Sequence, residues 1–139
     1  MTLKALTDIR VLDLGIVTAG AATSGVLADL GAEVIKIEGP TYIDPFRDWQ
    51  GTGDGDWWEQ SPPYRATNRN KKSVCLDLKS AQGRELFLQL VAMSDVVVEN
   101  FRVGVLGKLG IGFETLRQSN PRIVLASLSS QGATGPSAS

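Results

Sequence analysis

The sequence predicts an α/β fold: a mostly parallel sheet with helices packed on both of its faces. Short apolar runs alternate with stretches of helical periodicity along the 139 residues, and this alternation is typical of right-handed βαβ units. A run of three valines at 96–98 indicates a strand buried on both faces, as the central strands of parallel sheets are. The length suits one compact domain.

Five segments have the length and composition of strands, and we expect all of them to pair in parallel. They are residues 10–14, 33–37, 73–77, 95–99 and 123–127. Turn-forming residues border them, because Gly39 and Pro40 follow the second segment and Asn120 and Pro121 precede the fifth.

Helical segments separate most of these strands. Residues 21–30 form a predicted helix of small side chains. Ser80 is a predicted N-cap for a second helix, which carries an apolar stripe at helical spacing. Two short helical turns are expected around 105–109 and 113–119.

Residues 40–70 show no clear element, so we expect a long loop that is either functional or mobile. Three tryptophans lie in it: Trp49, Trp57 and Trp58. Aromatic side chains in a loop pack it onto the body of the protein, or they wall a ligand pocket or an interface. Cys75 lies within a predicted strand, so a buried and unreactive thiol is expected.

The composition argues against several classes of function. The net charge is −1, whereas a general nucleic-acid-binding protein carries a basic excess. A single cysteine excludes an intrachain disulfide and fits a reducing cytoplasm. The absence of histidine removes Ser-His-Asp catalysis within the chain and the commonest metal ligand. The longest uncharged stretch, between Asp13 and Asp29, is too short for a membrane span, and no targeting segment is evident. We therefore expect a cytoplasmic protein that binds no membrane, nucleic acid or metal.

Ligands of open α/β sheets bind beyond the carboxyl ends of the strands. The residues after each predicted strand are polar or rich in glycine, and they are 15–20, 38–39, 76–79, 100–102 and 127–135. Glu38 resembles the ribose-binding acid of a dinucleotide fold. The nearby glycines do not form the G-x-G-x-x-G fingerprint, however, which disfavours NAD binding.

Charge is segregated within the middle of the chain. Residues 44–59 hold five acids and one base, and residues 65–79 hold five bases and one acid. One interpretation is a pair of solvated loops. The other is that the basic run, Arg65, Arg69, Lys71, Lys72 and Lys79, meets a phosphorylated ligand.

Six motifs occur in an order that is informative as a set. They are IRVLDL at 9–14, LADLGAEVIKIE at 27–38, NRNKKSVCLDLK at 68–79, SDVVVENFR at 94–102, LGIG at 109–112 and NPR at 120–122. Together they resemble the N-terminal part of the family III CoA-transferases, the CaiB/BaiF type that includes formyl-CoA transferases. The α-methylacyl-CoA racemases belong to the same superfamily.

This resemblance implies a Rossmann-like large domain that binds coenzyme A, of which residues 1–139 are the N-terminal part. We expect the smaller domain and the C-terminal return of the large domain to be absent from this chain. The family forms an interlocked homodimer and transfers CoA between an acyl-CoA and a carboxylic acid. Its nucleophile is an aspartate, which is expected beyond residue 139, so the 139-residue chain alone is expected to be inactive.

The resemblance also implies which residues approach coenzyme A or its acyl group. They are Val17, Thr18 and Ala19 in the first loop, Leu76, Asp77, Leu78 and Lys79 beside the adenosine, Asn100, Phe101 and Arg102 in the same groove, and Lys108 near a phosphate. Three positions depart from the family pattern. Thr18 replaces a frequent glutamine, Lys108 a frequent arginine, and Gly39 a frequent basic residue. The basic run at 69–72 is a candidate to compensate for the last of these.

Two other functions remain open at this point. One is an acyl-CoA racemase or epimerase, which removes and returns an α-proton with a downstream acid/base pair. The sequence NRNK at 68–71 favours a transferase, because racemases more often have glycine near the second asparagine. The other is a non-catalytic CoA-binding fragment, which exchange of CoA between an acyl-CoA and a free acid would exclude.

Overall fold

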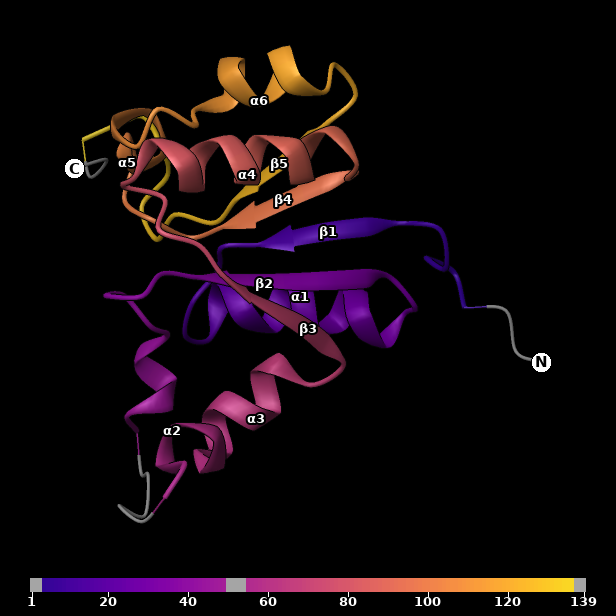
Figure 1. Cartoon of the computed structure of the whole chain (residues 1–139), viewed down its shortest axis with the longest axis vertical. Coiled ribbons are helices and arrows are strands. Elements are labelled where there is room, and N and C mark those ends of the chain that lie inside the picture. The colour runs from indigo at the N-terminus through magenta and orange to yellow at the C-terminus, as the bar shows by residue number, and fades with distance from the viewer. Residues whose placement is uncertain (1–3, 50–54, 137–139) are drawn as a thin grey trace.

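A single five-stranded sheet organises the protein (Figure 1). The computed structural model describes residues 4–49 and 55–136. The strands are β1 (Arg10–Asp13), β2 (Glu33–Glu38), β3 (Lys71–Cys75), β4 (Val96–Glu99) and β5 (Val124–Ser127). All pairs are parallel and the order is β3-β2-β1-β4-β5. The five predicted parallel strands are confirmed, although β3 begins two residues before its predicted start.

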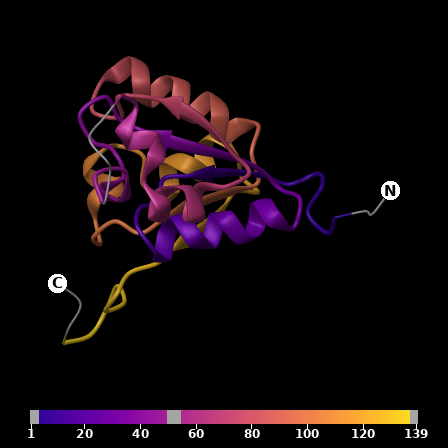
Figure 2. The ribbon, with the colours of Figure 1, turned by 90° about the horizontal axis from the view of Figure 1, so that it is seen from below.

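Helices lie on both faces of the sheet, as predicted. The helical elements are α1 (Ala19–Asp29), the 3₁₀ turn η1 (Pro45–Arg47), α2 (Trp57–Gln60), α3 (Pro62–Asn68), α4 (Ala81–Ala92), α5 (Val105–Lys108) and α6 (Phe113–Ser119). Figure 2 shows α1 and α4 on opposite sides of the strands. Helix α3 packs beside α1, and α6 packs beside α4. The Ser80 hydroxyl accepts a hydrogen bond from the backbone N–H of Gly83 at 2.9 Å, so the predicted cap of α4 is confirmed.

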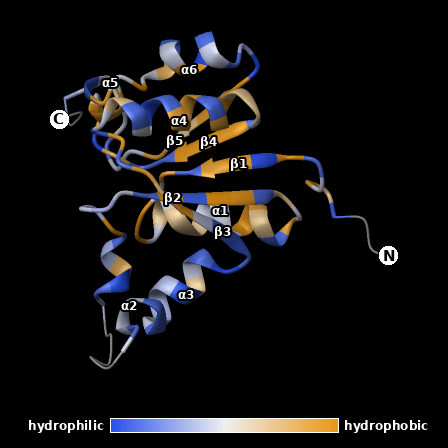
Figure 3. Cartoon of the chain, viewed as in Figure 1, coloured by the Kyte–Doolittle hydropathy of each residue, from blue (hydrophilic) through white to orange (hydrophobic). Residues whose placement is uncertain are grey.

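Two apolar clusters fill the space between sheet and helices. Leu12, Phe87 and Val97 belong to the cluster under α4 and α6. Val11 and Val98 belong to the cluster under α1. Successive side chains of a strand point to opposite faces, so the valine run of β4 is buried on both sides. Hydrophobic residues accordingly dominate β4 and β5, whereas the edge strand β3 is hydrophilic (Figure 3).

Helix α1 packs closely against its neighbours because its buried side chains are small. A Cβ atom added at Gly25 would lie 2.9 Å from the carbonyl oxygen of Thr67 in α3. Any larger residue at this position would push the two helices apart. The small-residue composition of the predicted helix thus permits α3 to pack directly against it.

The prediction that residues 40–70 lack regular structure is wrong. This segment contains η1, α2 and α3, although its residues 50–54, with Asp54 of the acidic run, lie outside the described residues. These helices are too short for a periodic pattern to reveal them. Their start signals are local: Asp44 accepts a hydrogen bond from the N–H of Phe46 at 2.9 Å, and Pro62 occupies the first turn of α3.

The prediction of a buried Cys75 is also wrong. Cys75 ends β3 and its free thiol is exposed. The sequence pattern does not distinguish a central strand from an edge strand, and β3 lies at the edge of the sheet. Among the described residues, no helix is both long and apolar enough to cross a membrane.

Candidate functional site

A groove of about 510 Å³ opens where the strands end, next to the point at which the strand order changes direction between β1 and β4. Open α/β sheets bind their ligands at this kind of position. Seven of the eleven residues that we predicted to bind coenzyme A line the groove. They are Leu76, Asp77, Leu78, Lys79, Asn100, Phe101 and Arg102.

The groove combines an apolar lining with cations at its rim. Leu14, Ile37 and Leu109 contribute further apolar surface. Lys79 and Arg102 are exposed, and neither side chain forms an ion pair within residues 4–49 and 55–136. Such a site fits a ligand that has both apolar parts and phosphates, which is the chemistry of coenzyme A. In the part of the chain that the structure describes, no cluster of residues could hold a metal ion.

Asn100 joins the end of β4 to the first loop. Its Oδ1 accepts a hydrogen bond from the N–H of Ile16 at 2.8 Å, and its Nδ2 donates one to the carbonyl oxygen of Ile16 at 3.0 Å. A Cβ atom added at Gly20 would lie 2.4 Å from the same Oδ1. Glycine is therefore required here for close packing.

Four of the predicted residues do not line the groove: Val17, Thr18, Ala19 and Lys108. The first three directly follow Ile16, which does line it, and Thr18 and Ala19 are exposed at the start of α1. Lys108 is exposed at the end of α5. Their contact with a ligand stays a prediction.

The solvated-loop interpretation of the basic run holds only in part for residues 69–72, because the side chains of Arg69 and Lys72 are exposed whereas that of Lys71 is buried. Arg69 pairs with Asp29, and Lys72 pairs with Glu33. Lys71 is buried and its Nζ lies 2.8 Å from Oδ2 of Asp13.

The ammonium group of Lys71 is therefore not available to a ligand, whereas compensation for Gly39 by the exposed Arg69 or Lys72 stays a prediction. Burial lowers the pKa of Lys71, although Asp13 opposes this effect. Asp13 also accepts a hydrogen bond from the N–H of Gly15, and Asp29 accepts one from Asn70. Both acids therefore have structural roles.

Glu38 is also fully engaged by protein groups. Arg47 donates three hydrogen bonds to its carboxylate, two from Nε at 3.0 and 3.2 Å and one from Nη2 at 2.6 Å, and the N–H of Asp44 donates another at 2.9 Å. Burial alone would raise the pKa of Glu38, but these donors outweigh it and hold the pKa below its usual value. The carboxylate is not free to bind a ribose, which agrees with the sequence argument against NAD.

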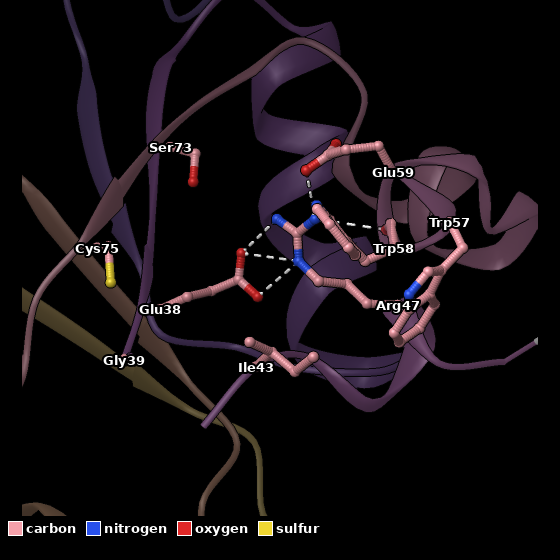
Figure 4. A pocket seen from close by; sticks show the side chains of 9 residues that line it. All are labelled: Glu38, Gly39, Ile43, Arg47, Trp57, Trp58, Glu59, Ser73 and Cys75. Atoms are coloured by element: carbon pink, nitrogen blue, oxygen red, sulfur yellow. Dashed lines mark hydrogen bonds and ion pairs between the residues drawn. The ribbon is translucent and has the colours of Figure 1, made fainter. Parts of the chain in front are cut away.

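Arg47 lies at the centre of a second hollow of about 320 Å³ (Figure 4). Its guanidinium also reaches Glu59 at 2.6 Å and lies over the ring of Tyr64, 3.8 Å from its centroid. The pKa of Tyr64 is raised, mainly by burial. Trp57 and Trp58 line this hollow, and a ligand-binding role for them stays a prediction.

Residues 6–139 match the family model of CoA-transferase family III. The chain belongs to this family. It is 45% identical over 137 residues to an acyl-CoA transferase of Fusarium pseudograminearum, covering 95% of this chain and 30% of that protein. It is 42% identical to the succinate–glutarate CoA-transferase of Agrobacterium fabrum, covering 94% of this chain and 34% of the relative.

Solved structures of family III proteins have the same fold. A crystal structure of a mutant of Rv3272 from Mycobacterium tuberculosis superposes with a TM-score of 0.88 at 38% identity, covering all of this chain and 36% of the other. A CAIB/BAIF family protein from Brucella suis gives 0.85 at 36% identity, covering 99% and 36%. The chain therefore spans about a third of the length of its family III relatives.

Sequence reasoning missed the buried polar residues near the groove. Lys36 and Asp44 are fully buried, and Arg47 and Tyr64 nearly so. One signal was present in the sequence. Lys36 lies two residues after the apolar Val34 and therefore shares its buried face of β2. A charged residue at such a position requires an internal partner.

Proposed function

We propose that the protein transfers coenzyme A between an acyl-CoA and a carboxylic acid, and that this chain supplies the CoA-binding groove. The observation that carries the proposal is the convergence of residues 76–79 and 100–102 in one groove at the strand ends. Family membership and the names of the relatives support the same reaction.

In this proposal the lining residues divide the ligand between them. Lys79 and Arg102 meet the phosphates, with Lys108 as a further cation. Leu76, Leu78 and Phe101 offer apolar contacts to the adenine or the pantetheine arm. Asp77 borders the adenosine. Residues 17–19 lie nearest the acyl end.

The nucleophile in the proposed mechanism is an aspartate beyond residue 139. Its carboxylate attacks the thioester carbonyl, the C–S bond breaks, CoA leaves as a thiolate, and the acyl group stays on the aspartate as a mixed anhydride. The thiolate then attacks the aspartyl carbonyl, which releases the first acid and leaves an enzyme thioester. The acceptor carboxylate attacks the enzyme thioester, which releases the CoA thiolate and forms a second mixed anhydride. The thiolate then attacks the acceptor's carbonyl in that anhydride, which forms the new acyl-CoA and restores the aspartate. We further propose that the natural full-length protein acts as an interlocked homodimer in the cytoplasm.

The test incubates the natural full-length protein with an acyl-CoA and a free acid of different mass. Mass spectrometry should detect the second acid as its CoA thioester. Failure to form it with any of a panel of mono- and dicarboxylic acids would contradict the proposal. Uptake of deuterium from D₂O at the α-carbon, without exchange of the acid, would indicate the racemase reaction instead.

A further inference from the structure

We infer that Asp44, together with Lys36, is a positioning residue that fixes the backbone of the first loop, residues 15–17, before the ligand binds. The inference rests on the proposed function, because this loop leads to the residues placed nearest the acyl end. Neither side chain was predicted to take part in the site, and Lys36 does not line the groove.

The first loop has a backbone conformation that does not form by itself. Val17 has φ of 55°, in the left-handed region. A β-branched residue rarely adopts this region, because its side chain is crowded against the backbone there. Such a conformation persists only where the surrounding structure imposes it. The contacts that impose it are therefore of functional interest.

Asp44 supplies one of these contacts. Its carboxylate is completely buried, and both oxygens lie within hydrogen-bond distance of the N–H of Val17, at 3.2 and 3.3 Å. Lys36 supplies the other contact. Its ammonium group lies 3.1 Å from Oδ2 of Asp44 and also donates a hydrogen bond to the carbonyl oxygen of Gly15. The pair thus holds the loop at both of its ends.

Asp44 is itself held in place. Its N–H donates to Glu38, which Arg47 binds, and its Oδ1 caps η1 through the N–H of Phe46. The segment 38–47 therefore holds the carboxylate of Asp44 against the first loop. Asn100 binds the N–H and the carbonyl of Ile16 in the same loop.

The chemistry of the pair favours a positional role over a purely stabilising one. A buried ion pair often adds no stability over an apolar pair of the same size. An apolar pair could not, however, accept from the N–H of Val17 and donate to the carbonyl of Gly15. Ordering a loop in advance removes the cost of ordering it during the reaction, so the pair should act on turnover more than on CoA binding.

The test replaces Asp44→Ala in the natural full-length protein and measures three quantities. The kcat of CoA transfer should fall at least about tenfold, while the Kd of CoA, measured by calorimetry, should stay within about threefold. Hydrogen exchange of a peptide covering residues 14–19 should become at least about tenfold faster. The double variant Lys36→Met/Asp44→Ala leaves no unpaired buried charge, so it should fold even where the single variant does not. It should give the same three results.

Val91→Ala is the matched control, because it removes buried volume under α4, on the opposite face of the sheet. Its kcat and the exchange of residues 14–19 should both stay within about twofold of wild type. Unchanged loop exchange in the Asp44 variants would overturn the inference, and so would faster exchange with unchanged kcat. A wild-type protein that neither binds CoA nor transfers it would instead contradict the proposed function, and the exchange data would still show whether Asp44 holds the loop.

Discussion

The two faces of the sheet bury side chains of different chemistry. Under α4 and α6 the core is apolar, with Leu12, Phe87 and Val91 among its buried members. Under α1 and α3 the apolar cluster is smaller, and two lysines are buried beside two aspartates: Lys36 with Asp44, and Lys71 with Asp13. The first face contributes stability by burial of apolar area. On the second face, part of the interior consists of charged side chains that make hydrogen bonds to the loop and the strand ends beside the groove.

The buried charges of the second face are all satisfied by protein groups. The side chains of Lys71 and Asp13 are buried, yet both are satisfied: Lys71 also donates to the carbonyl of Ala21 and to Asn68. No buried side-chain polar atom of the described residues lacks a partner. Because such a network is costly when one member is lost, the two faces should respond to substitution in different ways.

The largest expected effect is on the apolar face. Phe87→Ala should lower the free energy of unfolding by about 3–5 kcal/mol, because the ring is completely buried and its removal leaves a cavity. Leu86→Ala is the matched control, because Leu86 is adjacent in sequence but 42% exposed. It should lower the free energy of unfolding by less than about 1 kcal/mol. Urea denaturation of both variants measures the difference. Equal losses would show that α4 does not pack as described.

The next effect is on the polar face. Lys71→Met should lower the free energy of unfolding by about 3 kcal/mol, because it leaves the carboxylate of Asp13 buried without its cation. Lys72→Met changes the adjacent lysine, whose side chain is 71% exposed, so it should cost less than about 0.5 kcal/mol. Urea denaturation again separates the two, and a similar cost at both positions would contradict the distinction between the internal and the external ion pair.

A smaller effect is expected on ligand binding in the groove at the ends of the strands. Lys79→Ala and Arg102→Ala should each weaken CoA binding about tenfold, or about 1.4 kcal/mol, in the natural full-length protein. Both side chains are exposed, so thermal stability should not change. Arg122→Ala is the control, because Arg122 is exposed just before β5, at the amino end of the sheet. If calorimetry finds that all three variants bind CoA with the affinity of the wild type, the phosphates do not lie at Lys79 and Arg102.

The apolar face was predictable from the sequence, and the polar face was not. Periodicity located all five strands, and Ser80 identified the start of α4, because both signals depend on neighbours in the sequence. The family motifs identified the lining residues 76–79 and 100–102. The helices in 40–70 escaped prediction because long-range contacts stabilise them, and the packing of α3 against α1 is one such contact.

The charged residues show the same limit. Lys71 and Lys72 are adjacent in the sequence and look alike, yet one is 1% exposed and the other 71%. Which of them is buried depends on the face of β3 that α1 and α3 cover, and no local pattern contains that information. The partners of Lys36 and Lys71 lie 8 and 58 residues away, so only the folded chain pairs them.

The smallest expected effect is on the pH dependence of stability, and it should come from the residues that support the groove. The pKa of Glu38 lies below its usual value of 4.5 in the folded protein. The unfolded chain therefore binds a proton at Glu38 more readily, so this group stabilises the fold above about pH 4.5 and the contribution is lost as the pH falls through the folded pKa. In Glu38→Gln the free energy of unfolding should be lower at neutral pH and should fall less steeply between about pH 6 and pH 3.

Glu114→Gln is the control for this pH dependence. It removes an exposed carboxylate that forms no hydrogen bond or ion pair with the described residues, so the pH slope of its stability should match wild type. Phe87→Ala should shift the whole curve without changing its slope, because an apolar side chain binds no proton. Urea denaturation at a series of pH values measures all three curves, and an unchanged slope in Glu38→Gln would show that the contacts with Arg47 and Asp44 do not favour the ionised form.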